Sequence, residues 1–144
     1  MIATVKIKEI MNSKIIVLHP KDSISEAQDT FNRYHIHHIP VAVNRKLVGI
    51  LSLGDLLAAD KILQSQHPDK FPLATVAQLN TIEDIMTPYP YYIMGSDHLS
   101  KALEIMKEKR INCLPVIENG LLSGIVTSFD MINYLSKNIE SACE

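Results

Sequence analysis

The sequence predicts an α/β (α+β) protein built from two copies of one β-α-β-β-α unit. Three observations lead to this prediction. The chain has 144 residues, of which 47% are hydrophobic and 21% charged, a composition typical of a globular protein with a substantial core. The sequence also matches itself without gaps at a shift of 75 residues. In both copies, short β-branched runs alternate with stripes of helical period.

The internal repeat aligns Ile7–Asp60 with Ile82–Leu135. The matching pairs include Ile10-Met11 with Ile85-Met86, Asp22 with Asp97, Pro40-Val41 with Pro115-Val116, Gly49 with Gly124, and Asp55 with Asp130. We therefore expect copy one over residues 1–66, a connector over 67–81 and copy two over 82–144. Because a unit of about 54 residues buries little surface alone, the copies should pack together about a pseudo-two-fold axis and leave clefts between them.

The first half of each copy predicts a strand and then a helix. The strands are expected at Ile15–Leu18 and Pro90–Met94. Helical stripes follow, at Ile24, Ala27, Phe31 and Tyr34 in copy one and at Leu99, Ala102, Leu103 and Met106 in copy two. Ser23 and Ser96-Asp97 stand where helix N-caps belong.

The second half of each copy predicts a hairpin and a closing helix. The hairpin strands are His38–Val43 with Leu47–Ser52, and Cys113–Glu118 with Leu121–Thr127 across a tight Asn119-Gly120 turn. The closing helices are expected at about residues 54–64 and 129–138. A short helix is also expected in the connector, at Thr75–Leu79.

Charge and cysteine content exclude several classes of protein. Lys and Arg total 14 against 16 Asp and Glu, so the chain lacks the basic excess of a nucleic-acid-binding domain. We find no apolar run long enough to span a membrane and no signal-peptide pattern at the N-terminus. Two cysteines cannot build a disulfide framework. We expect a cytoplasmic protein without nucleic-acid or membrane partners.

The sharpest local pattern is Gly-x-x-Ser/Thr-x-x-Asp, with Ser52 and Asp55 in copy one and Thr127 and Asp130 in copy two. A strand here delivers a hydroxyl and then a carboxylate to the start of a helix, where free N–H groups favour a phosphate. The carboxylate could accept hydrogen bonds from ribose hydroxyls. The same spacing is also a helix capping box, so the residues alone leave both readings open.

Catalytic and metal-binding chemistry find little support in the sequence. Cys113 lies within an apolar strand, where a buried, unreactive thiol is expected. The sequence shows no phosphate-binding loop, nucleophile elbow or dinucleotide fingerprint. His35, His37 and His38 cluster without a cysteine or acid to complete a metal site. We therefore expect no enzyme activity, no required cofactor and no bound metal.

The repeated motifs resemble a tandem pair of CBS domains, named after cystathionine β-synthase and also called a Bateman module. Ile-Met begins each copy, His-Ile-Pro-Val or Cys-Leu-Pro-Val lies in the middle, and the hydroxyl-x-x-Asp motif comes at the end. The resemblance extends over nearly the whole chain. It implies a stand-alone regulatory protein that binds an adenosine ligand in the cleft between the two repeats.

The resemblance also implies roles for particular residues. Asp55 and Asp130 would hold ribose hydroxyls, while Ser52 and Thr127 would contact phosphate. Adenine would lie against two sets of positions: Ile16, Ile39 and Pro40 in copy one, and Tyr91, Leu114 and Pro115 in copy two. Nucleotide-binding members often place a basic residue two positions before the proline. That position is His38 in copy one and Cys113 in copy two, so we expect phosphate to favour the histidine side.

These expectations lead to a functional prediction. The chain would sense an adenine nucleotide of the AMP, ADP or ATP class, with AMP first because basic residues are few, and would act in trans on an unknown effector protein. The resemblance also implies a homodimer through the helices that follow each motif, with an apolar face drawn from Leu56, Leu57, Met131, Ile132 and Leu135. The alternatives are a ligand-free dimerisation scaffold and an S-adenosylmethionine sensor.

Overall fold

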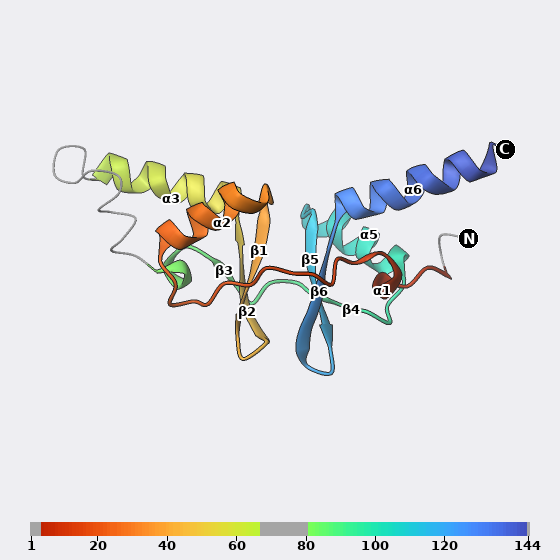
Figure 1. Cartoon of the computed structure of the whole chain (residues 1–144), viewed down its shortest axis with the longest axis horizontal. Helices are drawn as coiled ribbons and strands as arrows, with labels where there is room; N and C mark the ends of the chain where they lie inside the picture. The colour runs from red at the N-terminus through yellow and green to blue at the C-terminus, as the bar shows by residue number, and fades with distance from the viewer. Residues whose placement is uncertain (1–3, 67–80, 144) are drawn as a thin grey trace. The chain divides into compact units, whose positions relative to one another are not determined.

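The structure is a computed structural model that describes residues 4–66 and 81–143. The chain divides into two compact units. One unit, here called the continuous unit, runs from Ile16 to Pro90. The other, here called the split unit, combines the N-terminal segment up to Ile15 with the chain from Tyr91 onward. Both units can be followed by colour along the chain in Figure 1.

The continuous unit is a three-stranded antiparallel sheet with helices. Along the chain its elements are α2 (Ile24–Tyr34), β1 (His38–Val43), β2 (Lys46–Ser52), α3 (Leu53–Gln66), the 3₁₀ helix η2 (Ile82–Asp84) and β3 (Thr87–Pro88). The sheet order is β1-β2-β3. Alternate residues of β1 belong to the core, because Ile39 and Val41 point toward α2 and α3.

The split unit repeats this plan at a distance of 75 residues. Its elements are α1 (Ile7–Ile10), β4 (Ile93–Met94), α5 (Leu99–Lys109), β5 (Cys113–Glu118), β6 (Leu121–Thr127) and α6 (Ser128–Ala142). The sheet order is β4-β5-β6, with β4 parallel and β6 antiparallel to β5. The predicted hairpins and the two closing helices are confirmed, although α3 and α6 begin earlier and end later than the sequence indicated.

The first strands of the repeats are shorter than predicted. Ile15–Leu18 forms no strand and makes a single parallel bridge, between Leu18 and Val41. Only Ile93–Met94 of the second predicted strand is paired. The cap predicted at Ser96-Asp97 is also wrong, because α5 has His98 as its N-cap. The Asp97 carboxylate instead accepts a hydrogen bond from the Met94 N–H, at 2.9 Å.

The compact units do not follow the boundaries of the sequence copies. The segment that opens copy one packs in the split unit: the Ile7 N–H donates to the Asp97 carbonyl at 2.9 Å, and the Leu99 N–H donates to the Val5 carbonyl at 2.8 Å. The segment that opens copy two packs in the continuous unit, where the Ile82 N–H donates to the Asp22 carbonyl at 2.9 Å. The first turn of each copy therefore packs in the unit that is formed mainly by the other copy.

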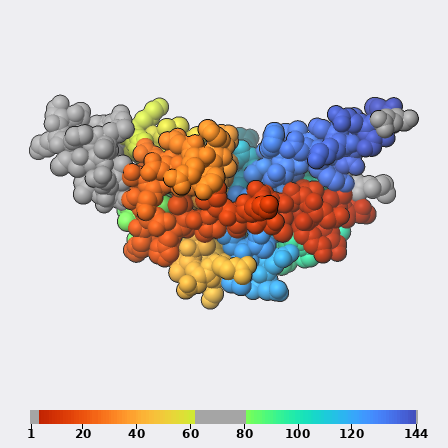
Figure 2. Space-filling model, in the orientation of Figure 1, coloured from red at the N-terminus to blue at the C-terminus, as the bar shows by residue number. Residues whose placement is uncertain are grey.

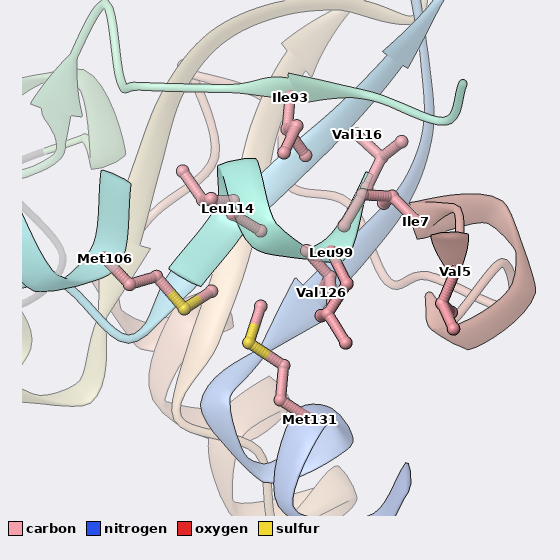
Figure 3. Close-up of a cluster of buried hydrophobic side chains, with 10 residues drawn as sticks. Val5, Ile7, Ile93, Leu99, Met106, Leu114, Val116, Val126 and Met131 are labelled. Carbon is pink, nitrogen blue, oxygen red and sulfur yellow. The ribbon is translucent and has the colours of Figure 1, made fainter. Parts of the chain in front are cut away.

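This exchange fills both cores. Val5 and Ile7 belong to the core of the split unit, with Ile93, Leu99, Ala102, Met106, Leu114, Val116, Val126 and Met131. Figure 3 shows Ile7 beside Leu99 and Val116, and Met106 and Met131 extending toward each other from α5 and α6. In the continuous unit, Ile82 is fully buried in the equivalent place. Burying one such side chain contributes about 1.5–3 kcal/mol, so neither core is complete without the exchanged segment.

The exchange also explains the glycine of each motif. A Cβ atom on Gly124 would lie 2.8 Å from the Met11 Sδ and 2.9 Å from the Asn12 carbonyl oxygen. A Cβ atom on Gly49 would collide with the Met86 sulfur. The close approach at these glycines is therefore made by the exchanged segments of the chain itself.

The predicted connector lies almost entirely outside the described residues. The short helix expected at Thr75–Leu79 falls there as well. Thr81, the last residue of the predicted connector, is described, and it forms an antiparallel bridge with Ser23. Thr81 therefore belongs to the folded part of the continuous unit.

Candidate adenosine sites at two equivalent sheet ends

In the continuous unit, three predicted site segments meet at one end of the sheet. His38 at the start of β1 pairs with Ser52 at the end of β2. The Leu18–Val41 bridge is parallel, so Ile16 lies toward that same end of β1. Because α3 begins directly after Ser52, its first turn brings Asp55 to this end too. The sheet register thus brings together residues from three separate stretches of chain.

The split unit has the equivalent arrangement. Cys113 pairs with Thr127 across β5 and β6, and Ile93 pairs in parallel with Val116. The register places Tyr91 near the start of β5. Helix α6 begins directly after Thr127 and carries Asp130 in its first turn. The two motifs predicted from the sequence therefore occupy equivalent positions in the two units.

Each motif carboxylate caps its helix through one oxygen atom. Asp55 Oδ2 accepts from the Ser52 N–H at 3.0 Å, and the Asp55 N–H donates to Ser52 Oγ at 2.9 Å. Asp130 Oδ2 accepts from the Thr127 N–H at 2.8 Å and from the Thr127 hydroxyl at 2.9 Å. The capping interpretation is therefore correct. Across the described parts of the chain, Oδ1 of both carboxylates has no hydrogen bond, so capping leaves one acceptor on each.

The predicted adenine-contacting residues differ in accessibility. Ile39 and Leu114 are 0% exposed and pack in the two cores, so their side chains offer no surface to a ligand in this structure. Because side chains alternate along a strand, Pro40 and Pro115 lie on the opposite sheet face, where both are also buried. Ile16 is half-buried, whereas Tyr91 is 53% exposed. Tyr91 is thus the most accessible of these positions.

The pKa of the residue two positions before each proline is shifted in opposite directions in the two units, and both shifts favour the neutral side chain. Burial lowers the pKa of His38, the neighbouring His37 lowers it further, and Asp55 opposes this shift. Burial, together with Asp130, raises the pKa of Cys113 to about 12. The Cys113 side chain is 6% exposed, which confirms the predicted buried cysteine, and its raised pKa favours the protonated thiol at neutral pH.

Two features of these sheet ends were missed in the sequence. A pocket of about 240 Å³ lies between the end of α2 and the start of α3, and it is lined by Phe31, Asn32, His35, Ile36, His37 and Leu53. In the split unit, the Lys109 ammonium group lies over the Tyr91 ring, 5.3 Å from its centroid. Lys109 is 18 residues from Tyr91 in sequence, so no local motif signals this contact.

The five residues predicted to form a dimer face differ in exposure, and Leu135 is half-buried. Leu56 and Met131 are each 2% exposed and belong to the cores, so this part of the prediction is wrong. Leu57 and Ile132 are more than half exposed, and Phe129 and Ile139 extend the exposed apolar stripe along α6. The far half of α6 extends away from the body of its unit, as Figure 2 shows.

The described residues contain no group of three or more His, Cys, Asp or Glu side chains that could hold a metal ion. Within the same residues, no helix combines the length and hydropathy that crossing a membrane requires.

The CBS domain family model matches residues 7–61 and 82–137, which covers both sequence copies. The chain belongs to the CBS domain family. Inosine-5'-monophosphate dehydrogenase from Streptococcus pyogenes serotype M3 is 32% identical to it over 133 residues, which cover 88% of this chain but only 24% of the dehydrogenase. The same enzyme from Korarchaeum cryptofilum is 32% identical over 81% of this chain and 21% of its own length. The match to these enzymes is thus confined to a CBS-sized portion of each.

Solved structures of CBS domain pairs share the fold. The CBS domain pair of protein MJ0100, in complex with 5'-methylthioadenosine and S-adenosyl-L-methionine, superposes with a TM-score of 0.77 at 26% identity, covering 93% of this chain and 98% of that one. CBSX2, known from Arabidopsis thaliana, was solved in complex with AMP. It has a TM-score of 0.76 at 26% identity, with 92% and 96% coverage. Structural neighbours of this CBS pair therefore bind adenosine ligands.

Proposed function

We propose that this CBS pair is a regulatory module that binds an adenosine ligand, with AMP as the first candidate, and acts in trans on a partner protein. The observation that carries the proposal is the repeated sheet end, where Asp55 and Asp130 each keep one carboxylate oxygen beyond the capping interaction. That oxygen can accept a hydrogen bond from a ribose hydroxyl. The adenosine ligands of MJ0100 and CBSX2 support the same class of ligand.

A thermal-shift series with AMP, ADP, ATP and S-adenosylmethionine tests the proposal. A ligand present at 100 times its dissociation constant should stabilise the folded chain by about 2.7 kcal/mol. Calorimetry on Asp55→Ala and Asp130→Ala then assigns binding to each unit. Unchanged affinity in both variants would leave the two carboxylates with a capping role alone.

Two alternatives are outcomes of the same series. A shift with S-adenosylmethionine alone would identify an S-adenosylmethionine sensor. The CBS domain pair of MJ0100, which was solved in complex with S-adenosyl-L-methionine, motivates this alternative. No shift with any of the four compounds would favour a ligand-free scaffold. Turnover of a nucleotide would contradict our proposal that the chain is a binding module without catalytic activity.

We also propose self-association through the exposed apolar stripe of α6, formed by Phe129, Ile132 and Ile139. Sedimentation of the Ile132→Asp variant, compared with the unmodified chain, tests this part of the proposal. A sedimentation coefficient that does not change would contradict it.

Cys113 and Cys143 are both free thiols, which is consistent with a cytoplasmic protein.

A further inference from the structure

Met11 and Met86 lie against the motif glycines of the two units. They stand at equivalent positions, 75 residues apart, and each belongs to the segment that opens a sequence copy. A Cβ atom on Gly124 would lie 2.8 Å from the Met11 Sδ, and one on Gly49 would collide with the Met86 Sδ. Each sulfur atom therefore fills the space beside a glycine Cα atom that a side chain would otherwise occupy.

The residue after each methionine pairs with the same strand. Asn12 forms an antiparallel bridge with Ile125 of β6, through two hydrogen bonds of 2.8 and 3.0 Å between their backbone groups. Thr87 pairs with Ile50 of β2 in the antiparallel β2–β3 register. Each methionine thus directly precedes the point where an exchanged segment joins a motif strand.

The motif hydroxyls lie farther along the same two strands. Ser52 follows Gly49 by three residues on β2, and Thr127 follows Gly124 by three residues on β6. A strand rises about 3.3 Å per residue, so about 10 Å of strand separates each sulfur contact from a motif hydroxyl. Loss of the sulfur contact would therefore loosen the strand that positions the hydroxyl and the start of the following helix.

The methionines differ in how well an oxidant in solvent can reach them. Met94 is 48% exposed, whereas Met106 and Met131 are buried in the core of the split unit (Figure 3). Met11 and Met86 are half-buried and pack against the cores of their units. Among the methionines that the structure describes, only these two combine partial exposure with a contact at a motif glycine.

A peroxide converts the methionine thioether to a sulfoxide in one balanced step. The sulfur lone pair attacks one oxygen of hydrogen peroxide, so that an S–O bond forms while the O–O bond breaks. The proton of the transferred oxygen passes to the leaving hydroxide, which departs as water. Sulfur is oxidised by two electrons and the peroxide is reduced by two.

The sulfoxide oxygen does not fit the contact at either glycine. On the glycine side, the sulfur atom already fills the available space. On the core side, the oxygen would be a strong acceptor among apolar side chains, which is unfavourable without a hydrogen-bond donor. The oxidised side chain must therefore turn toward solvent, and its contact with the motif strand is lost.

We propose that Met11 and Met86 are peroxide-sensitive modification sites, where conversion to the sulfoxide releases the exchanged segments from the motif strands. Methionine sulfoxide reductases reverse this reaction, so the release is reversible. The effect on the strands needs no ligand. The effect on an adenosine ligand rests on the proposed function: a loosened β2 or β6 presents Ser52 or Thr127 less well, and affinity falls.

Titration with hydrogen peroxide tests the proposal, with peptide mass spectrometry to locate each sulfoxide. The starting chain carries Cys143→Ala, because the exposed Cys143 thiol also reacts with peroxides. Met94 should be oxidised first without a change in Tm. As Met11 and Met86 are oxidised, Tm should fall by about 4–10 °C, and hydrogen exchange should become faster in β2 and β6. Treatment with both sulfoxide reductases should restore the original Tm.

Leucine variants show which methionines are responsible. Met11→Leu combined with Met86→Leu should abolish the fall in Tm, because leucine conserves the side-chain volume and has no sulfur. Met94→Leu is the matched control and should remain as sensitive as the starting chain. An equal fall in Tm in the double leucine variant would overturn the proposal. Complete oxidation of Met11 and Met86 without faster exchange in β2 and β6 would also overturn it, and this measurement needs no leucine variant to fold.

The affinity for AMP separates this inference from the proposed function. After oxidation, the chain should bind AMP about threefold more weakly or worse. If AMP does not bind even before oxidation, the proposed function fails, and the exchange of β2 and β6 still decides the modification sites. If AMP binds equally well before and after oxidation, the regulation by peroxide is wrong while the proposed function stands.

Discussion

The continuous and split units share their backbone contacts but differ in the side chains around the motif. The hydrogen bond from Ile7 to Asp97 has its counterpart from Ile82 to Asp22. Yet the position two residues before the proline is His38 in one unit and Cys113 in the other. The positions that hold the fold have therefore stayed alike between the copies, while the positions that set local charge have diverged.

The largest expected effect is a loss of folding stability. It tests whether each sequence copy stabilises the unit that is formed mainly by the other copy. Ile7 is 0% exposed in the core of the split unit, so Ile7→Ala should lower the free energy of unfolding by about 2–5 kcal/mol. Denaturant unfolding measures the loss. Hydrogen exchange should show weaker protection first in β6, although Ile7 belongs to sequence copy one.

Ile82→Ala is the matched variant in the continuous unit, where it should weaken protection first in β2. Glu104→Ala, at an exposed position on α5, serves as the surface control and should change stability by less than about 0.5 kcal/mol. Weakened protection of β2 after Ile7→Ala would contradict the exchanged packing.

The second prediction concerns alkaline stability, which should depend on the split unit. The pKa of Cys113 is about 12 in the folded chain, above the ordinary value of 9.0. Between these values only the unfolded state loses the thiol proton, so stability should fall as pH rises above 9, by about 1.4 kcal/mol per pH unit. Chemical denaturation at pH 8 to 10.5 measures this slope. Cys113→Ala should remove the contribution, whereas Cys143→Ala, at an exposed position, should not.

The third prediction compares two glycines. Gly120 has φ of 78° in the β5–β6 turn, a conformation that costs other residues about 1 kcal/mol. Gly120→Ala should therefore destabilise the chain by about that amount. Gly54 lies in α3, and a Cβ atom there would meet only Ser52 Oγ at 3.6 Å. Gly54→Ala should stabilise by about 0.5–1 kcal/mol, and a shift of the same sign in both variants would contradict the turn geometry.

The smallest expected effect is a loss of stability in acid, which should depend on His38 in the continuous unit. The pKa of His38 is lowered mainly by burial, so the unfolded state binds the proton more readily. The free energy of unfolding should therefore increase as the pH rises toward the ordinary histidine pKa of 6.5. It should decrease as the pH falls below 6.5, by less than about 1.4 kcal/mol per pH unit. Denaturation of His38→Asn between pH 5 and 7.5 should show a shallower slope. An unchanged slope would assign the acid sensitivity to other groups.

Local patterns predicted most of the fold. The Pro-Val strands are short apolar runs bounded by turns, Asn119-Gly120 is a strong tight-turn signal, and both hairpins form as expected. The exchange of the first turns could not be predicted, because a repeat in sequence does not say which copy's core receives Ile7 or Ile82. The length of the strand predicted at Pro90–Met94 is overestimated for a similar reason. Only Ile93–Met94 is paired, because tertiary packing decides which residues find a partner.

The candidate sites were predictable where one motif carries them and not where distant residues meet. The capping geometry of Asp55 and Asp130 is predictable because their spacing from a hydroxyl is fixed by the first helical turn, whereas their role toward a ligand stays a prediction. Ile39 was assigned to the ligand although strand alternation turns its side chain into the core. The Lys109–Tyr91 contact joins a helix end to an early strand segment, and no spacing rule links such positions.

The exchanged first turn also sets an order of events during synthesis. As the chain leaves the ribosome, every element of the continuous unit has been made once Pro90 has been added, so this unit can assemble first. Val5 and Ile7 are made earlier, but their partners in β6 and α6 are made only after the continuous unit. The split unit therefore closes a long loop, and it can do so only after β6 and α6 have been made.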